Sequence, residues 1–337
     1  MVRGRAVLAR VVVTGLVCAG VAACGDSANT TTAVVESVAA APSTPAPPDP
    51  AAVAANELGV VPVLMYHQLS PHPAGDYDQT PEEFRAELER LFREGYRPIT
   101  MAQYGSGEID LPAGTHPVVL TFDDSTGSQV RFGDDGILAP DCAVAILQDV
   151  AAAQTPAVAP RATFYVNNDP FAGDGRALPW LAAHGYEIGA HTADHSNLGQ
   201  LNADGVQREL VQNVRAITAA VPGIDVRTMA LPLGVFPSDH ALAAAGTWEG
   251  TAYRFDTVLL VGANPAPSPY GPVDHGAVPR IRSGRGEVPF DSAYWLDRLA
   301  ADPAQRYTAD GDPARISYPR AGGADPDPRW ASRANPY

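Results

Sequence analysis

Two short segments of the sequence carry side chains that could hold a metal ion and activate a water molecule. Asp123 and Asp124 follow the apolar run 118–122, and His191 and His195 lie in the segment EIGAHTADH. Consecutive residues at the end of a strand point in opposite directions, so one carboxylate can ligate a metal while its neighbour faces bound water. Metal-assisted hydrolysis needs this division, because one acid fixes the ion and the other takes a proton.

The histidine pair alone is a weak indication of a metal site, and the aspartate pair strengthens it. A His-x-x-x-His spacing brings two imidazoles to one metal on a helix or a tight turn, but alone it is more typical of surface or capping histidines. Capping of the following turn explains one of the two aspartates and is a poor explanation of both. The aspartate pair therefore favours the metal interpretation of His191 and His195.

The hydrophobic pattern predicts an α/β scaffold that brings the two segments together. Short apolar runs alternate with amphipathic stretches, as expected for a parallel sheet covered by helices. With about seven parallel strands and no glycine-rich dinucleotide motif, we favour a closed (β/α) barrel over an open doubly wound sheet. The predicted strands are 59–67, 97–100, 117–122, 161–166, 186–190, 227–231, 256–261 and 278–282, and the predicted helices are 80–95, 140–152, 177–184, 203–220, 238–245 and 291–301.

Polar residues follow several of these strands directly. In parallel α/β folds, active sites lie at the carboxyl ends of the strands. We therefore expect one rim of the barrel to collect His67, the aspartate pair, Asn167 and His191.

Charge and composition exclude some classes of partner. The 337 residues are 45% hydrophobic, contain no lysine and carry a formal net charge of −15. An acidic surface of this size repels nucleic acid and anionic lipid headgroups. We therefore expect no nucleic-acid partner.

The first 23 residues resemble a lipoprotein signal peptide. Arg3, Arg5 and Arg10 precede an apolar stretch shorter than the roughly 20 residues that a transmembrane helix needs. The segment VAAC at 21–24 resembles the lipobox of bacterial lipoproteins, with an ordinary signal peptide cut nearby as the alternative. We expect a lipid anchor on Cys24 that holds the protein on the extracellular face of the cytoplasmic membrane.

The rest of the chain divides into three predicted parts. Residues 24–56 are rich in Ala, Pro, Ser and Thr and predict a flexible tether. A catalytic domain is predicted at 57–301, and residues 302–337 form a C-terminal extension that is either a loose tail or packed across the barrel. Cys142 is left without a disulfide partner, and we expect it to be a buried helix residue.

Three motifs resemble the polysaccharide deacetylase family over roughly residues 60–285. TFDD at 121–124 and HTADH at 191–195 resemble its first two motifs, with ATFYV at 162–166 between them. YRFDTVLLVGANP and VPRIRS resemble the later strands of a lipoprotein-like branch. This family consists of metal-dependent carbohydrate esterases with a distorted (β/α) barrel.

The resemblance implies roles for the residues that match. Asp123 would be the general base, and Asp124, His191 and His195 would bind a divalent metal, commonly Zn²⁺. Thr192 would order the histidine loop. The substrate would be an acetylated glycan, and the metal would polarise the acetyl carbonyl that water attacks.

Several positions depart from the family pattern. Ser125 stands where glycine is usual, and Ala230 in ALPLG replaces the arginine that would orient the base. The later motifs that would supply the general acid are absent. His67 is our candidate for the general acid, with a purely structural role as the alternative. Arg280 and Arg282 are candidates for the missing positive charge near Asp123, and Pro232 and Gly234 for shaping the site backbone. His275 is a further candidate for the site.

These observations predict a hydrolase that removes acetyl groups from an N-acetylated, or alternatively O-acetylated, cell-wall or extracellular polysaccharide. The first alternative is a non-catalytic, metal-containing glycan-binding lipoprotein. The second is an iron oxygenase with a two-His-one-carboxylate site, which the adjacent second aspartate and the ligand order disfavour.

Overall fold

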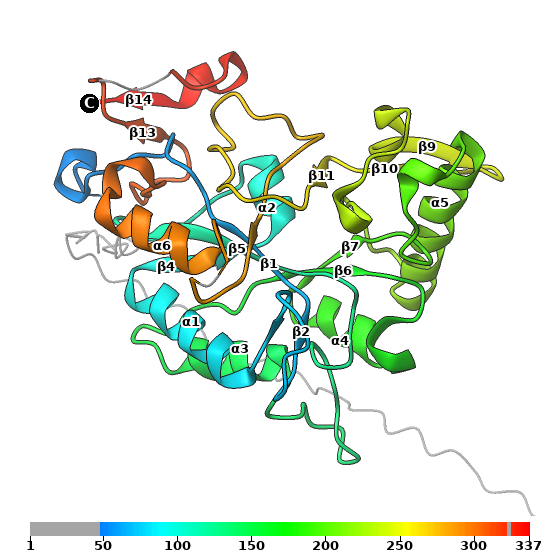
Figure 1. Ribbon diagram of the computed structural model, residues 1–337. Helices are drawn as coiled ribbons and strands as arrows, with labels where there is room; N and C mark the ends of the chain where they lie inside the picture. Colours follow the sequence, from blue (N-terminus) through cyan, green and yellow to red (C-terminus); the bar gives the residue numbers. More distant parts are fainter. Residues whose placement is uncertain (1–47, 287, 322–324) are drawn as a thin grey trace, which may run out of the picture. The chain divides into compact units, whose positions relative to one another are not determined.

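The chain is built around a curled parallel sheet (Figure 1). The computed structural model describes residues 48–286, 288–321 and 325–337. Seven strands follow one another in the order β11-β8-β7-β6-β5-β1-β12, and β4 pairs with β5 beside this path. The eight strands of this sheet are β1 Val63–Tyr66, β4 Tyr96–Ile99, β5 His116–Phe122, β6 Thr163–Val166, β7 Glu187–Ala190, β8 Thr228–Ala230, β11 Thr257–Leu259 and β12 Ile281–Arg282.

The two ends of the sheet approach each other through the segment before β12. An isolated parallel bridge joins Leu259 of β11 to Val278, and an antiparallel bridge joins Ala263 to Ile281. All strand pairs of the sheet are parallel. The predicted α/β fold, a distorted (β/α) barrel with about seven parallel strands, is therefore confirmed.

Alternation along β5 decides which side chains reach the inside of the curl. Val118, Leu120 and Phe122 belong to the hydrophobic cluster that the outer helices cover, whereas Val119 belongs to a second cluster on the other face. Successive side chains of a strand point to opposite faces. Asp123 is an even number of positions from Val119 and lies on the same face of the strand, so its carboxylate points to the inside of the curled sheet.

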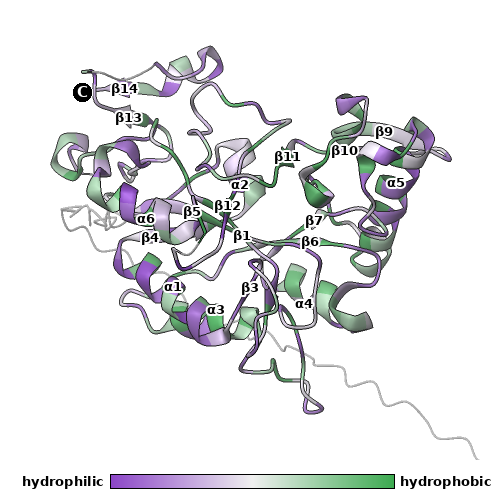
Figure 2. Ribbon diagram, viewed as in Figure 1, coloured by the Kyte–Doolittle hydropathy of each residue, from purple (hydrophilic) through white to green (hydrophobic). Residues whose placement is uncertain are grey.

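Within the described ranges, six α-helices connect or flank the strands. Helix α1 has the predicted capping box, in which Thr80 and Glu83 bond each other's backbone N–H groups. Helices α1 and α5 carry both hydrophobic and hydrophilic residues (Figure 2), and their apolar faces pack on the sheet. The helices are α1 Pro81–Arg93, α2 Met101–Ser106, α3 Ala143–Ala152, α4 Ala177–Ala183, α5 Ala203–Ala220 and α6 Ser292–Ala301.

The region after β8 differs from its predicted helix 238–245. Only a short 3₁₀ helix, His240–Ala243, forms there, and the hairpin of β9 (Ala245–Trp248) and β10 (Thr251–Arg254) follows. The two residues of its turn, Glu249 and Gly250, both have positive φ, as a tight hairpin turn requires. The remaining short strands are β2 Gln68–Leu69, β3 Asp78–Gln79, β13 Ile316–Tyr318 and β14 Ala334–Pro336.

The two ends of the described chain pack against each other. A 3₁₀ helix spans Pro50–Val53, and Asn56 forms a bridge with Thr308. The described part of the segment 302–337 packs onto the second cluster instead of forming a loose tail. The backbone at the end of the predicted tether therefore pairs with the C-terminal segment.

The predicted signal peptide 1–23, the lipidation site Cys24 and most of the predicted tether lie outside the described residues. Within the described ranges, none of the helices has the length and apolar composition needed to cross a bilayer. Cys142 is buried at the start of α3, close to the predicted position.

Glu57 is expected to make the stability of the fold depend on pH. The residue is 4% exposed, and burial raises the pKa of its carboxyl from 4.5 to about 8, although bonds donated by Ser317 N–H and the Tyr307 hydroxyl oppose this. The folded state thus retains a proton that the unfolded chain releases, so this stabilisation is complete below pH 4.5 and is lost as pH rises through 8. It amounts to roughly 5 kcal/mol at about 1.4 kcal/mol per pKa unit.

Glu57→Gln should flatten the pH dependence of the free energy of unfolding, measured by urea titration at pH 5, 7 and 9. Glu89→Gln, on the exposed face of α1, is the matched control and should follow the wild type. Equal losses of stability between pH 5 and 9 in wild type and Glu57→Gln would contradict this assignment.

Candidate metal centre

Three side chains converge at the carboxyl ends of β5 and β7. One oxygen of Asp124 lies 3.3 Å from Nε2 of His191 and 3.3 Å from Nε2 of His195. All three ligand atoms lie within 4.8 Å of one another, and the three residues line a cavity of about 440 Å³. Among the described residues, this oxygen of Asp124 is buried and accepts no hydrogen bond. A carboxylate oxygen facing two imidazole nitrogens fits a divalent metal ion.

The backbone turns sharply to bring these ligands together. Asp124, Thr192 and His195 all have positive φ, between 54° and 69°. Residues other than glycine are uncommon in this conformation, and such residues gather at functional sites. The predicted proximity of the aspartate pair and the histidine pair is therefore realised through strained loops.

Two asparagines hold the histidine loop in place. Asn167 donates from Nδ2 to the carbonyls of His191 and Thr192, at 2.6 and 2.9 Å. Asn213, fully buried on α5, accepts from the His191 N–H at 3.1 Å and donates to the carbonyl of Val166. These bonds connect β6 and α5 to the first histidine ligand.

The orientation of His191 leaves its outer nitrogen available. Nδ1 lies 2.8 Å from the carbonyl oxygen of Ala230, so it is the protonated nitrogen of the neutral ring. Nε2, which faces Asp124, would then offer its lone pair to a bound metal ion. A backbone carbonyl that fixes the tautomer in this way is the usual support of a metal-binding histidine. Ala230, the position where the family arginine is missing, thus contributes through its backbone.

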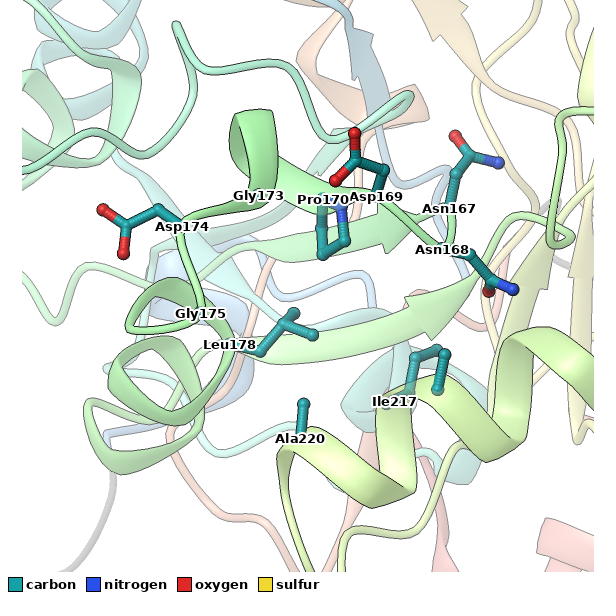
Figure 3. Close-up of a pocket in the computed structure, with 11 residues that line it drawn as sticks. Asn167, Asn168, Asp169, Pro170, Gly173, Asp174, Gly175, Leu178, Ile217 and Ala220 are labelled. Carbon is teal, nitrogen blue, oxygen red and sulfur yellow. The ribbon is translucent and has the colours of Figure 1, made fainter.

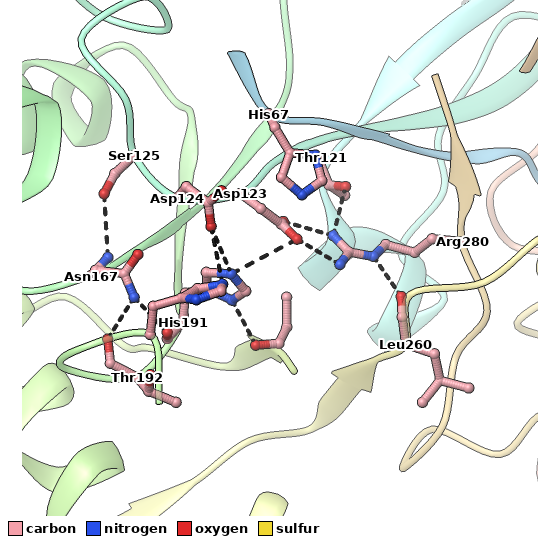
Figure 4. Close-up of polar contacts among 12 residues, drawn as sticks. His67, Thr121, Asp123, Asp124, Ser125, Asn167, His191, Thr192, Leu260 and Arg280 are labelled. Carbon is pink, nitrogen blue, oxygen red and sulfur yellow. Dashed lines mark hydrogen bonds and ion pairs between the residues drawn. The ribbon is translucent and has the colours of Figure 1, made fainter. Parts of the chain in front are cut away.

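Arg280 supplies the positive charge beside Asp123. Its guanidinium donates to both carboxylate oxygens, at 2.7 and 2.6 Å, and also bonds the Thr121 hydroxyl and the carbonyl of Leu260 (Figure 4). Arg280 is 0% and Asp123 1% exposed. A bidentate pair of this kind fixes both charge and orientation. The arginine absent from position 230 is thus replaced from the segment preceding β12.

The charges of the site keep both carboxyls ionised. Burial alone would raise the pKa of Asp123, but Arg280 and then His191 outweigh it and lower the pKa well below the ordinary range. Burial also acts to raise the pKa of Asp124, and the contact with His191 lowers it. Arg280 engages both oxygens of Asp123, whose Oδ2 lies 4.0 Å from Nε2 of His191, whereas Asp124 lies 3.3 Å from both histidines.

His67 lines the same cavity, as predicted from its place after β1. Its ring is partly buried, and its Nδ1 makes no hydrogen bond within the described chain. Burial lowers the pKa of His67, an effect that the nearby Asp123 and Asp124 oppose. The imidazole therefore sits beside the two carboxylates without a structural bond to account for it.

The other predicted residues are divided between the site and its surroundings. Pro232 and Gly234 form a 3₁₀ turn that carries the exposed Leu233 into the cavity lining. Arg282 does not contact Asp123, because it points to Asp76, 3.3 Å away. His275 contacts Arg329 and does not line the cavity.

A second cavity lies behind Asn167. It has about 260 Å³ and extends between the loop after β6 and helix α5 (Figure 3). Leu178, Ile217 and Ala220 give it an apolar side. Across the described ranges, the set Asp124, His191 and His195 is the one group of three that could hold a metal, so we assign no chemistry to this second cavity.

Asn213→Ala should weaken metal binding without touching a metal ligand. Loss of the bond to the His191 N–H frees the loop, and supports of this kind typically contribute about 10–100-fold in metal affinity. Competition with a chromophoric chelator measures this affinity. Arg208→Ala, exposed on the same helix, is the control and should bind metal like the wild type. An unchanged affinity in Asn213→Ala would show that the loop is held by other contacts.

Comparison with known proteins finds a family model that matches the part of the chain that carries this site. Residues 110–247 match the polysaccharide deacetylase family model. The matched region contains the aspartate pair, both histidines and the loop at Ala230, while His67 and Arg280 lie outside it.

Two curated relatives are similar over this region. The chain is 29% identical over 140 residues to a chitooligosaccharide deacetylase of Rhizobium leguminosarum bv. phaseoli, covering 41% of this chain and 54% of that protein. It is 28% identical over 132 residues to one of Sinorhizobium fredii, covering 39% and 54%. The chain thus spans about half the length of the curated relatives it matches.

Solved structures of deacetylases share the fold. A Streptococcus pyogenes deacetylase in complex with acetate superposes with a TM-score of 0.53 at 18% identity, covering 70% of this chain and 97% of that one. A Bacillus cereus polysaccharide deacetylase superposes with the same score at 19% identity, covering 70% and 68%. At these identities the similarity shows the barrel architecture.

Proposed function

We propose that the protein is a metal-dependent hydrolase that removes acetyl groups from N- or O-acetylated units of a cell-wall or extracellular polysaccharide. The observation that carries this proposal is the pairing of Asp123 with Arg280 directly beside the set Asp124, His191 and His195. Such a site would hold a metal and a separate ionised carboxylate within one cavity. This is the division of labour that hydrolysis of an amide or ester requires.

The chain's own groups have distinct tasks. Asp124, His191 and His195 would hold a divalent ion, which we propose to be Zn²⁺, and the bound ion would polarise the acetyl carbonyl and lower the pKa of a water molecule. Asp123 accepts a proton from the attacking water. Arg280 keeps Asp123 ionised and fixes the orientation of its carboxylate at the cavity.

His67 is the proposed proton donor to the leaving sugar nitrogen or oxygen. It lines the cavity, and its Nδ1 has no hydrogen-bond partner within the described ranges. His67→Gln should retain the metal and lower kcat by about 10²-fold, the usual contribution of a general acid. Metal content and acetate release, measured on the same preparation, check both parts. A variant with wild-type kcat would leave His67 a structural role.

Acetate release from a panel of acetylated glycans tests the proposal. Zinc-loaded protein should release acetate from chitooligosaccharides or peptidoglycan fragments, and chelator-treated protein should not. The alternative is a non-catalytic glycan-binding protein. Metal-loaded protein that binds these glycans but releases no acetate from any of them would favour this alternative and overturn the hydrolase.

We also propose that Cys24 carries a lipid anchor that places the domain on the extracellular face of the cytoplasmic membrane. The VAAC segment after a short apolar stretch supports this placement. Cys24→Ala should move the protein from the membrane fraction to the soluble fraction of a bacterial host that processes lipoproteins. An unchanged distribution would contradict the anchor.

A further inference from the structure

Gln129 bridges the two strand ends that carry His67 and Asp123. Its Nε2 donates to the backbone carbonyls of these two residues, at 2.6 and 2.5 Å. Both partners are carbonyl oxygens, so the nitrogen of the side-chain amide must face them, and both of its N–H groups are used. The side chain is completely buried. Gln129 therefore supports the site without reaching the cavity, which His67 and Asp123 line and Gln129 does not.

The two carbonyls lie at the point where β1 and β5 stop pairing. The strands pair in parallel as far as Tyr66 and Phe122, and the Asp123 N–H still donates to the carbonyl of Tyr66 at 2.9 Å. Buried carbonyls beyond the last strand pair need another donor, because an unsatisfied one costs about 1–3 kcal/mol. The amide of Gln129 thus takes the place of a further backbone bond between the two strand ends.

Helix α3 holds the backbone of Gln129. The carbonyls of Ser128 and Gln129 accept from the N–H groups of Ala143 and Val144, the first two residues of the helix, at 3.0 and 3.1 Å. The N-cap residue Cys142 makes no side-chain capping bond, so these two carbonyls satisfy N–H groups that the helix leaves unpaired. Because α3 packs its apolar residues into the core, the bridge is anchored to a rigid element.

The neighbouring side chain fixes the same end of β1 at a second point. Oγ of Ser128 accepts from the N–H of Leu69, two residues after His67, at 2.9 Å. Ser128 and Gln129 thus hold one carbonyl and one N–H of the segment 67–69, while Gln129 also holds Asp123. The backbone of His67 cannot shift relative to that of Asp123 without breaking one of these bonds.

We propose that Gln129 is a positioning residue that fixes the general base Asp123 and the general acid His67 relative to each other by tying both backbones to helix α3. The inference rests on the proposed function, in which the two groups act on opposite sides of the same reaction. A misplacement of about 1 Å can cost on the order of 10²-fold in rate. Loss of the bridge should therefore lower kcat, whereas zinc should be retained because all three ligands are still present.

Two substitutions of nearly equal volume test this inference on zinc-loaded protein with N-acetylated chitotetraose. Methionine donates no hydrogen bond, so Gln129→Met should lower kcat by at least about tenfold at every pH and change KM by less than about threefold. Glutamate donates one hydrogen bond when protonated and repels both carbonyls when ionised. The kcat of Gln129→Glu relative to the wild type should therefore fall by at least about fivefold between pH 6 and pH 9. The control is Gln154→Met, which removes an amide donor to the carbonyl of Val150 outside the cavity and should keep wild-type kcat.

The outcomes separate this inference from the proposed function. Wild-type kcat in Gln129→Met, or a relative kcat of Gln129→Glu that is equal at pH 6 and pH 9, would overturn the positioning role and leave the hydrolase intact. Loss of zinc from Gln129→Met would also overturn it, since the bridge would then serve the metal site as a whole.

Urea titration shows whether the variants are folded. If Gln129→Met does not fold, Ser128→Ala replaces it, because it removes only the bond to the Leu69 N–H. Its kcat should be lower by about threefold, and an unchanged kcat would count against the positioning role. A wild type that releases no acetate from any glycan would overturn the hydrolase and, with it, this role.

Discussion

An Arg280→Met variant is expected to lose acetate release by more than about 100-fold and to lose about 3–5 kcal/mol in free energy of unfolding. The pair of Arg280 and Asp123 is completely buried, so removal of the guanidinium leaves a carboxylate charge without a partner in a site shielded from water. The carboxyl then takes up a proton more readily and also loses its orientation. Both changes remove the base that the attacking water needs.

A second substitution separates the two effects. Asp123→Leu combined with Arg280→Met removes both charges, so stability should return towards that of the wild type while activity stays absent. Urea titration and acetate release measure the two quantities independently. Arg227→Met, which breaks the exposed pair with Asp256, should cost less than about 1 kcal/mol. A similarly small loss in Arg280→Met would show that Asp123 does not depend on this partner.

The sequence predicts that the aspartate pair and the histidine pair lie close together, because both signals are local. Each of the two motifs follows a strand, and parallel strands bring their carboxyl ends to one rim. Asp123 and Asp124 obtain their different directions from strand alternation and from the positive φ at Asp124. Ser125 also has positive φ, which explains why glycine suits this position in the family.

The partners of these residues are harder to predict because they come from distant segments. Arg280 reaches Asp123 from 157 positions further along the chain, and sequence alone does not separate it from Arg282. The two arginines lie on opposite sides of a single intervening residue, yet one points into the curl and the other to Asp76. Asn213 gives no signal at all, since a polar residue on a helix is usually solvated.

In the fold, too, elements with local sequence signals are predictable, whereas contacts between distant segments are not. Periodicity and the Thr80 capping box predict α1 and α5, because these patterns are contained within the helix itself. The packing of residues 48–56 on the C-terminal segment depends on pairing across about 250 residues, such as Asn56 with Thr308. A Pro- and Ala-rich composition describes the local chain and carries no information about such a partner.

Asp123→Asn and His191→Ala are expected to separate catalysis from metal binding. Asp123 lies outside the set of ligand atoms, so Asp123→Asn should retain zinc and lose about 10²–10⁴-fold in kcat, the range for loss of a general base. His191→Ala removes a ligand, so the metal affinity should fall by more than about 100-fold and activity should disappear with it. Metal content after dialysis and acetate release under excess zinc measure the two properties.

The control for both variants is His275→Ala, which alters a histidine outside the cavity and should leave both readings unchanged. Recovery of His191→Ala activity at high zinc concentration would still agree with a ligand role, because mass action can refill a weakened site. Loss of zinc from Asp123→Asn would instead place this carboxylate among the ligands. The assignment of Asp124 as the ligand and Asp123 as the base would then be reversed, since a single site of this geometry needs one carboxylate for each task.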